Sequence, residues 1–261
     1  INRMAEPKEI ANYIVDLATE KNSYMTGQTI DVAKLEPGEV IEGDREYAFA
    51  RRDVEFDPDH PSYLQKTNFL ALVRDERLAE LNTIMDPVST RLKIMKNQKI
   101  IAEWNLKGDE KREASEFFKA YLDMPEDEGV HLVRATGGAK KHSFSDVPDK
   151  AVSFINLNSI KHLEEKIGNK VDPIRFRGNV YFSGEQPWIE FDWIEKEVRI
   201  GTAILKVFKR TKRCAATAVN PETGVRDMNI PKDLKNYYDH MDMGIYAEVL
   251  VGGTIKIGDR I

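Results

Sequence analysis

The sequence predicts a mostly β fold with peripheral helices, in the α+β class. Short segments of strand-forming residues, separated by turn residues, recur at a spacing of about 8–12 residues between Gly168 and Val207. Apolar residues at helical spacing occur in only a few short segments. Many short strands with few helices favour a sheet that curls into a barrel.

Four segments carry an apolar stripe at helical spacing. Residues 6–21 form the first, and we expect a helix there. A second helix is expected after Asp75, which can cap it, with its stripe at positions 78, 81 and 84. The remaining helices are expected at residues 109–122 and 160–167, the latter capped by Asn158 or Ser159 and stopped by Gly168.

The predicted strands are short and are bounded by turn residues. A hairpin is expected around Asn97-Gln98, and residues 53–62, rich in Asp and Pro, are expected to form a surface loop. The expected strands are residues 28–32, 47–50, 92–95, 99–104, 130–134 and 151–157, with two more around Gly252-Gly253 in residues 244–261.

Composition narrows the class of protein. Hydrophobic residues make up 41% and charged residues 32% of the 261 positions, which is the balance of a soluble globular protein. The net charge of -5 gives no general attraction to nucleic acid or to an anionic membrane, and no apolar run approaches the ~20 residues of a membrane helix. We expect no signal peptide and a reducing, cytoplasmic location, since the N-terminus lacks a basic start and an apolar core and the chain has one cysteine.

That cysteine, Cys214, follows a run of cations and is the clearest candidate for chemistry. A lone thiol acts as a thiolate, either as a nucleophile or as a soft metal ligand, and nearby positive charge favours the thiolate. Strand alternation would place Arg210, Lys212 and Cys214 on one face. The alternative is a small buried side chain at the end of a strand. The preceding cations are Lys206, Lys209, Arg210, Lys212 and Arg213.

Two further groups of polar residues are candidates. Arg175, Arg177 and Asn179 have the same parity and would share one face of a strand, where they could hold a polyanion or equally form ordinary salt bridges. Residues 142–146 combine His142, Ser143 and Asp146, but a polar turn is favoured over a catalytic triad there. The histidines show no zinc-site spacing, and nucleotide-binding glycine loops are absent.

From Lys34 onward the chain resembles a MOSC-domain protein, the family named for the C-terminal domain of molybdenum-cofactor sulfurase. The resemblance depends most on the segment Arg213-Cys214-Ala215-Ala216-Thr217 and the following Asn220-Pro221-Glu222-Thr223-Gly224. Its other motifs are residues 35–39 with Gly43-Asp44-Arg45, residues 69–78, Phe144-Ser145-Asp146, Arg175-Phe176-Arg177-Gly178-Asn179 and Tyr246-Ala247-Glu248.

This resemblance implies a fold, a cofactor and site residues. It implies an N-terminal β-barrel-like subdomain at residues 33–122 and a MOSC β-barrel at residues 123–261. Its cofactor would be the molybdenum cofactor (molybdopterin), with Cys214 as the metal ligand and Asp146 lining the site as a second catalytic residue. The residues expected to hold the pterin and its phosphate are Arg45, Arg175, Arg177, Asn179, Lys212 and Arg213. The family also carries an association with pyridoxal phosphate.

The resemblance implies two different activities. One is a reductase of N-hydroxylated or N-oxygenated small molecules, supplied with electrons by a ferredoxin-, flavodoxin- or reductase-type partner protein. The other is a carrier of sulfur, as a persulfide on Cys214, or of the cofactor, without redox turnover. A third possibility is a fusion in which the cofactor pocket no longer closes. Lys212 stands where the reductases tend to have serine.

Residues 1–32 resemble something else, the C-terminal tail of a short-chain dehydrogenase. The segments that carry this resemblance are residues 3–11 and 23–32. They include neither the dinucleotide loop nor the catalytic residues of that family, so no dehydrogenase activity is implied. The first strand that MOSC-family proteins usually have, with its lysine, is absent from this chain, and residues 28–32 would take its place. Such tails often lie at subunit interfaces, so we expect that residues 1–32 can mediate oligomer formation.

Overall fold

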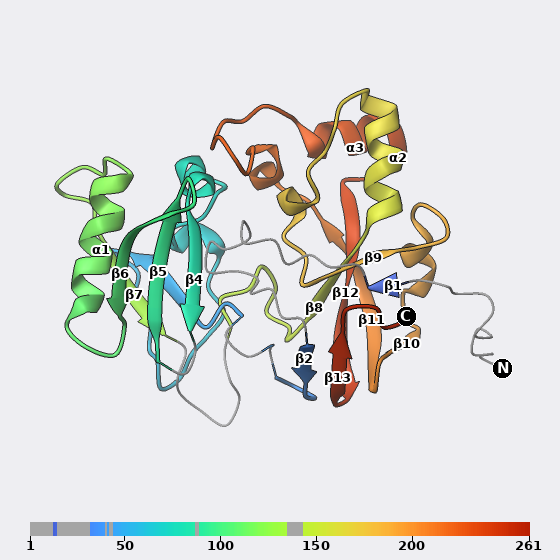
Figure 1. Ribbon diagram of the computed structural model, residues 1–261, viewed down its shortest axis with the longest axis horizontal. Coiled ribbons are helices and arrows are strands. Elements are labelled where there is room, and N and C mark those ends of the chain that lie inside the picture. Colours follow the sequence, from blue (N-terminus) through green and yellow to red (C-terminus); the bar gives the residue numbers. More distant parts are fainter. Residues whose placement is uncertain (1–12, 15–31, 40, 42–43, 87–88, 135–142) are drawn as a thin grey trace.

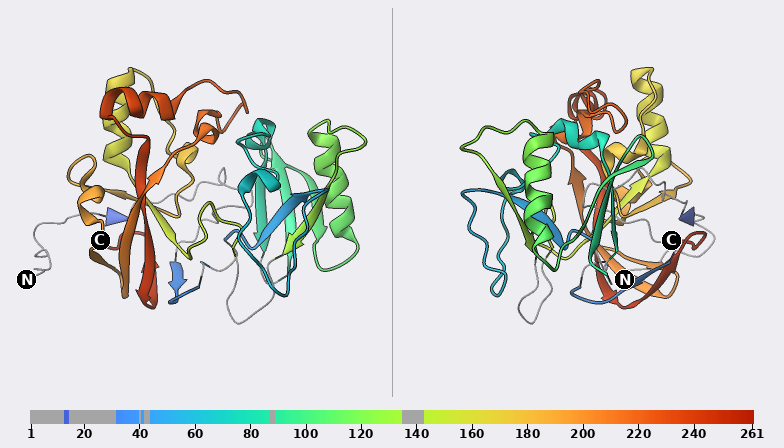
Figure 2. Two further views of the ribbon diagram at one scale, coloured as in Figure 1. Left: turned by 180° about the vertical axis from the view of Figure 1, so that it is seen from behind. Right: turned by 60° about the vertical axis from the view of Figure 1, so that its left-hand side comes forward.

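The computed structural model describes residues 13–14, 32–39, 41, 44–86, 89–134 and 143–261 (Figure 1). Strands predominate and three α-helices accompany them within these residues, which confirms the predicted mostly β, α+β class. The strands gather into two units that lie side by side (Figures 1 and 2). We call residues 44–134 the first unit, and residues 143–261 with the two strands that precede residue 36 the second unit.

The described residues of the first unit form two small antiparallel sheets, one α-helix and two 3-10 helices. One sheet pairs β3 with β7, and the other has the order β4-β5-β6. Its core is formed by Phe49, Leu92, Ile94 and Phe118, all nearly inaccessible to solvent. Its elements are β3 (Tyr47–Arg51), η1 (Lys66–Asn68), η2 (Glu76–Glu80), β4 (Asn82–Asp86), β5 (Arg91–Lys96), β6 (Lys99–Asn105), α1 (Glu110–Tyr121) and β7 (Val130–Arg134).

Local signals predicted part of this unit correctly. The hairpin of β5 and β6 turns at Asn97 and Gln98, both at positive φ, and α1 buries Phe118 as expected. The helix predicted after Asp75 is wrong beyond one short 3-10 helix, η2, because the chain then extends into β4. The Asp75 carboxylate instead accepts a hydrogen bond from the Ala71 N–H at 2.9 Å.

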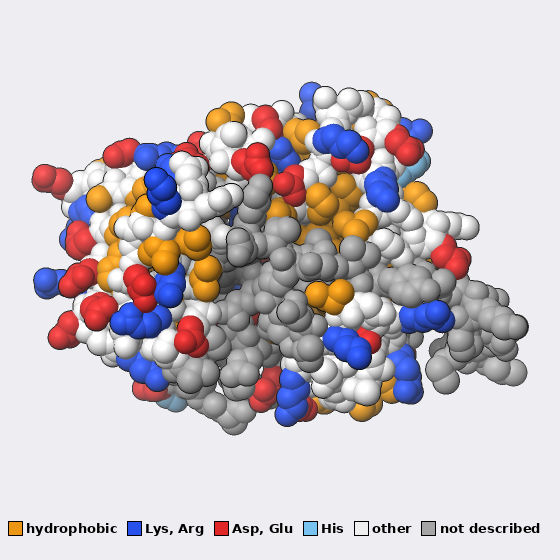
Figure 3. Space-filling model, viewed as in Figure 1, with side chains coloured by type: hydrophobic (Ala, Val, Ile, Leu, Met, Phe, Trp, Pro, Cys, Tyr) orange, Lys and Arg blue, Asp and Glu red, His pale blue; other side chains and the backbone are white. Residues whose placement is uncertain are grey.

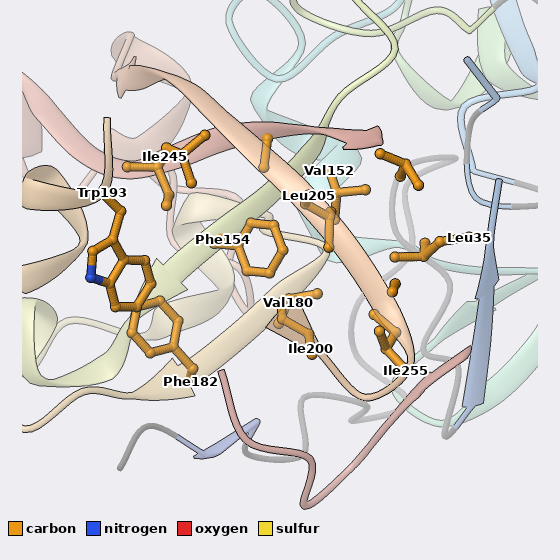
Figure 4. Packing of buried hydrophobic residues seen from close by; sticks show 14 of the residues in the cluster. Leu35, Val152, Phe154, Val180, Phe182, Trp193, Ile200, Leu205, Ile245 and Ile255 are labelled. Carbon is orange, nitrogen blue, oxygen red and sulfur yellow. The ribbon is translucent and has the colours of Figure 1, made fainter. Parts of the chain in front are cut away.

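The second unit is built on a six-stranded sheet with the order β1-β9-β8-β12-β11-β10. The pair β8–β9 is parallel and the other pairs are antiparallel. Phe154, Phe182 and Trp193 lie close together in its core, and the rings of Phe182 and Trp193 stack at 5.3 Å (Figure 4). The strands are β1 (Tyr13–Ile14), β2 (Val32–Leu35), β8 (Val152–Asn156), β9 (Val180–Ser183), β10 (Glu197–Ile200), β11 (Ala203–Lys212), β12 (Asp242–Val251) and β13 (Gly253–Lys256).

Two α-helices and three 3-10 helices cover this sheet. The cap of α2 is Asn156, whose side chain accepts the Asn158 N–H, so the predicted caps Asn158 and Ser159 are wrong by two or three residues. Gly168 ends α2 in the left-handed conformation, as predicted. The helix α3 was not predicted. These helices are α2 (Leu157–Ile167), η3 (Pro173–Phe176), η4 (Ile189–Trp193), η5 (Ala215–Ala218) and α3 (Ile230–Tyr238).

The N-terminal segment differs from prediction where it is described. Tyr13 and Ile14 form β1, which pairs antiparallel with β9, so the helix predicted over residues 6–21 is wrong at these two positions. The rest of that helix and most of the strand predicted at residues 28–32 lie outside the described residues. The described part of that strand continues as β2, which pairs with β13. No helix in the described residues has the length and apolarity needed to cross a membrane.

Gly244, in β12, is expected to be the most sensitive glycine of this sheet. Its φ is +82°, and an added Cβ would lie 2.2 Å from the backbone oxygen of Phe154. We expect Gly244→Ala to lower the free energy of unfolding by about 3 kcal/mol, because left-handed strain adds to a forced backbone shift. Gly258→Ala is the matched control, since Gly258 has φ +88° but open space around it, and should cost about 1 kcal/mol. Urea unfolding of both variants checks this, and equal losses would contradict it.

Candidate functional site

A cavity of about 390 Å³ lies between the two units. Its volume is within the range of about 300–1,000 Å³ typical of small-molecule sites. The first unit contributes an apolar wall, residues 69–73 with Tyr47 and Phe49, and the second unit contributes most of the charged groups. The charged lining residues are Arg45, Lys66, Asp146, Arg175, Arg177, Lys209, Arg210, Lys212 and Arg213.

Cys214 lies on the wall of this cavity. The strand β11 ends at Lys212, and Cys214 immediately precedes η5. Its carbonyl oxygen accepts hydrogen bonds from the Thr217 N–H at 3.1 Å and the Thr217 hydroxyl at 2.9 Å, which fixes the local backbone. The side chain is exposed, so the alternative of a buried structural cysteine is wrong. The thiol is therefore available to a molecule in the cavity.

The cations of β11 do not follow simple alternation. Register shifts occur between Val207 and Lys209 and between Arg210 and Lys212, because bulges interrupt the pairing with β12. Arg210 lies over the Phe191 ring at 4.2 Å, while Lys212 is exposed beside Cys214. The expectation that a regular strand face carries these three residues is wrong, although all three line the cavity.

Arg213 supports the backbone around the site. Its Nε donates to the carbonyl of Met243 at 2.8 Å and its Nη1 donates to the carbonyl of Phe176 at 2.9 Å. Burial lowers the pKa of Arg213, an effect that the nearby Tyr246 and Asp146 oppose. The guanidinium thus links β12 to η3 directly behind Cys214.

Arg175 and Asn179 are also engaged with the protein. Arg175 forms two hydrogen bonds with the Asp227 carboxylate, at 2.7 and 2.9 Å. Asn179 accepts from the Ser153 hydroxyl at 2.8 Å and donates to Asp44 at 3.2 Å. The predicted strand face shared with Arg177 is wrong, because the segment is a 3-10 helix followed by a left-handed residue. Asn179 is not among the residues that line the cavity.

Arg177 differs from both, because it lines the cavity and has no side-chain partner among the described residues. Its φ is 50°, which turns the chain out of η3. It makes no hydrogen bond or ion pair with any residue that the structure describes. Burial, together with the nearby Arg45 cation, lowers the pKa of Arg177 to about 10. A desolvated, unpaired guanidinium that stays charged at neutral pH favours an anionic ligand.

Arg45 and Asp146 carry charge at the edge of the cavity. Arg45 forms an ion pair with Asp44, and the carboxylates of Asp44 and Asp146 outweigh burial to raise the pKa of Arg45. Asp146 pairs with Lys66 at 2.5 Å. Burial acts to raise the pKa of Asp146, but Lys66 and two arginines outweigh burial and hold this pKa below its ordinary value. Asp146 is therefore an ionised carboxylate at neutral pH and not a proton donor.

The structure adds two site residues to those predicted. Lys66 comes from η1 in the first unit, and no spacing signal in the sequence connects it with Asp146. Tyr246 lines the cavity from β12, and burial, with Asp146, raises its pKa. In the stretch proposed as a triad, the Ser145 hydroxyl donates to the carbonyl of Val147 at 2.5 Å, which makes a local polar turn, and His142 lies outside the described residues.

The cavity as a whole is strongly cationic. Eight of its lining residues are lysine or arginine and one, Asp146, is a carboxylate. The outer surface in Figure 3, by contrast, shows cations and carboxylates interspersed. A cavity with one thiol and this excess of positive charge is suited to an anion that also carries a thiophilic centre. The described residues contain no cluster of three or more His, Cys, Asp or Glu side chains that could hold a metal by themselves.

Comparison with known proteins identifies the second unit. The MOSC domain family matches residues 139–261. Mitochondrial amidoxime-reducing component 1 of Mus musculus is 30% identical over 115 residues, which cover 40% of this chain and 33% of that protein. Molybdenum cofactor sulfurase of Caenorhabditis briggsae is 28% identical over 217 residues, covering 78% of this chain and 29% of that protein. The chain thus spans about a third of the length of these curated relatives.

A solved structure, the YUAD protein from Bacillus subtilis, aligns over 96% of this chain and 91% of its own, at 12% identity and a TM-score of 0.37. That score is too low to support an argument. The family match includes every candidate residue from Asp146 to Tyr246, while Arg45 and Lys66 precede it. The resemblance of residues 1–32 to a dehydrogenase tail stays a prediction. Residues 139–261 of this chain are a MOSC domain.

Proposed function

We propose that this protein binds the molybdenum cofactor between its two units and reduces N-hydroxylated or N-oxygenated small molecules with electrons from a partner protein. The observation that carries the proposal is the exposed Cys214 thiol in a cavity where Arg177 has no hydrogen-bond or ion-pair partner in the part of the chain that the structure describes. Relatives named amidoxime-reducing component and molybdenum cofactor sulfurase support it.

The residues present fit this cofactor. A thiolate is a soft ligand, suited to a heavy, thiophilic metal, and Cys214 is the only cysteine in the chain. Arg177 and Lys212 have no ion-pair partner among the described side chains, so both are available to the anionic phosphate and pterin. Arg45, already paired with Asp44, would add positive potential at the same edge.

The bound cofactor would supply a metal centre that accepts two electrons and delivers them to the substrate. Reduction of a hydroxylamine to an amine consumes two electrons and two protons and releases one water. The Tyr246 hydroxyl, whose pKa burial raises, would be available as a proton donor at neutral pH, and the Lys66 side chain, paired with Asp146, lies near the same edge. The apolar wall at residues 69–73 would exclude water and hold the uncharged part of the substrate.

One observation also favours a second function. A sulfur carrier needs an accessible thiol, and Cys214 is exposed. In that case the cationic cavity would hold an anionic donor or acceptor of sulfur, or the cofactor itself, and no redox turnover would occur. The electron-donor protein belongs only to the first function, and self-association through residues 1–32 stays a prediction compatible with both.

Two measurements on one preparation separate these functions. The protein is purified from a host that makes the molybdenum cofactor, and its metal and pterin contents are determined together with its intact mass. Near-stoichiometric molybdenum and pterin, with consumption of benzamidoxime by a chemically reduced sample, would support the reductase. An added mass of sulfur on Cys214, removed by cyanide and without turnover, would support the carrier. Absence of both would contradict the proposal.

A further inference from the structure

The segment Asn220-Pro221-Glu222-Thr223-Gly224 follows Cys214 closely in sequence but takes no part in lining the cavity. It forms a tight loop whose ends, Val219 and Arg226, pair as an antiparallel bridge. The Asn220 side-chain oxygen accepts hydrogen bonds from the Glu222 N–H at 2.8 Å and the Thr223 N–H at 3.2 Å. The loop therefore has a defined conformation that the cavity lining does not account for.

The tip of this loop lies against the first unit. Gly224 has φ +67°, and an added Cβ would come within 3.1 Å of the Glu80 side chain and 3.3 Å of the Glu76 carbonyl. Both neighbours belong to η2, so the loop of the second unit lies at van der Waals distance from η2 of the first unit.

Arg226 joins the two walls of the cavity. Its Nη1 donates to the carbonyl of Ala215, the residue after Cys214, at 2.8 Å. Its Nη2 donates to the carbonyls of Leu72 and Val73, both at 3.0 Å, in the opposite, apolar wall. The Glu76 carboxylate lies 3.3 Å from the same Nη2. One planar guanidinium thus holds both walls at a fixed separation.

The next residue fixes the loop to the rest of the site. Asp227 accepts the two hydrogen bonds from Arg175, whose Nη1 donates to the carbonyl of Ala218 at 3.2 Å. Asn220 also donates to Asp227 at 2.7 Å. The loop, η3 and η5 are therefore connected, and a displacement of Arg226 is transmitted to the backbone next to Cys214.

We propose that Arg226 is a positioning residue that sets the width of the cavity and so limits the size of the molecule that reaches Cys214. A lysine cannot replace it, because one ammonium reaches the carbonyls of one wall or the other, whereas the two Nη atoms reach both. This assignment holds whichever anion occupies the cavity, and its test requires no cofactor.

The test compares how fast Cys214 reacts with a small and a bulky thiol reagent, iodoacetamide and fluorescein maleimide. Cys214 is the only cysteine, so the adduct mass reports one site. In Arg226→Ala the rate with the bulky reagent should rise about tenfold while the rate with iodoacetamide changes little, because losing hydrogen bonds from a charged donor shifts local opening by about that factor. Circular dichroism and thermal unfolding establish that the variant is folded.

Three further variants make the result specific. Arg226→Lys should also react faster with the bulky reagent, and restoration of the wild-type ratio by lysine would overturn the proposal. Glu76→Gln keeps the three carbonyl contacts and should match the wild type. Arg91→Ala removes an arginine of the β5–β6 hairpin that pairs with Glu103 and does not line the cavity, and it should also match the wild type. If Arg226→Ala does not fold, Arg226→Lys decides, and an unchanged ratio in either folded variant overturns the assignment.

Discussion

Replacement of Cys214 by alanine is expected to yield a folded protein that retains almost no molybdenum. The side chain is exposed at the end of β11, so its loss should change the free energy of unfolding by no more than about 0.5 kcal/mol. Metal content should fall by about 100-fold or more, because loss of a ligand removes more affinity than loss of a supporting hydrogen bond. Elemental analysis of protein from a cofactor-competent host measures this directly.

Cys214→Ser is the matched variant for this experiment. It keeps the shape of the side chain but replaces a soft sulfur by a hard oxygen, so it should lose molybdenum nearly as fully as alanine. Pterin content is measured in parallel, because Arg177 and Lys212 remain in both variants. Molybdenum at the wild-type level in either folded variant would contradict the ligand assignment and with it the proposed reductase.

Replacement of Arg177 by methionine is expected to stabilise the ligand-free protein while removing its response to anions. The pKa of Arg177 falls to about 10 from an ordinary value near 12.5, so the folded state disfavours the charged form. This destabilisation is fully present below about pH 10 and diminishes as the pH rises towards the unfolded-state pKa. At neutral pH its removal should add roughly 1–3 kcal/mol, a rise of several degrees in Tm.

The second part of this prediction uses inorganic phosphate as the probe. Phosphate should raise the Tm of the wild-type protein, since it binds the folded state, and should leave Arg177→Met nearly unchanged. Arg199→Met is the control, because Arg199 is exposed on β10 and lies outside the cavity lining. A lower Tm for Arg177→Met than for the wild type, or an equal rise in Tm with phosphate, would contradict the prediction that the Arg177 guanidinium is unpaired and binds the anion.

The elements that were predicted correctly are those determined by residues close together in the sequence. The turn at Asn97-Gln98, the stripe of α1 and the stop at Gly168 are each encoded within a few residues. The pairing of β3 with β7 joins segments about 80 residues apart, and no local pattern reports it. The helix predicted after Asp75 failed for the same reason, since packing in a sheet overrode a three-residue apolar stripe.

For the site, sequence patterns located the residues better than they predicted their geometry. Cys214 and four of its five preceding cations line one cavity, while Lys206 does not. The predicted strand face shared by Arg175 and Arg177 failed, because a 3-10 helix replaces a regular strand there, and the Arg175 guanidinium is committed to Asp227. Lys66 was not predicted, since its approach to Asp146 depends on how the two units pack.

The pairing of β2 with β13 has a consequence for how the second unit can be isolated. Because β2 precedes the first unit in sequence and β13 follows it, the described strands of the second unit flank the first, which is a topological insertion. A fragment that begins at residue 143 therefore lacks β2, the partner of β13. We expect such a fragment to leave the backbone of β13 unpaired at that edge and to be less stable than the intact chain.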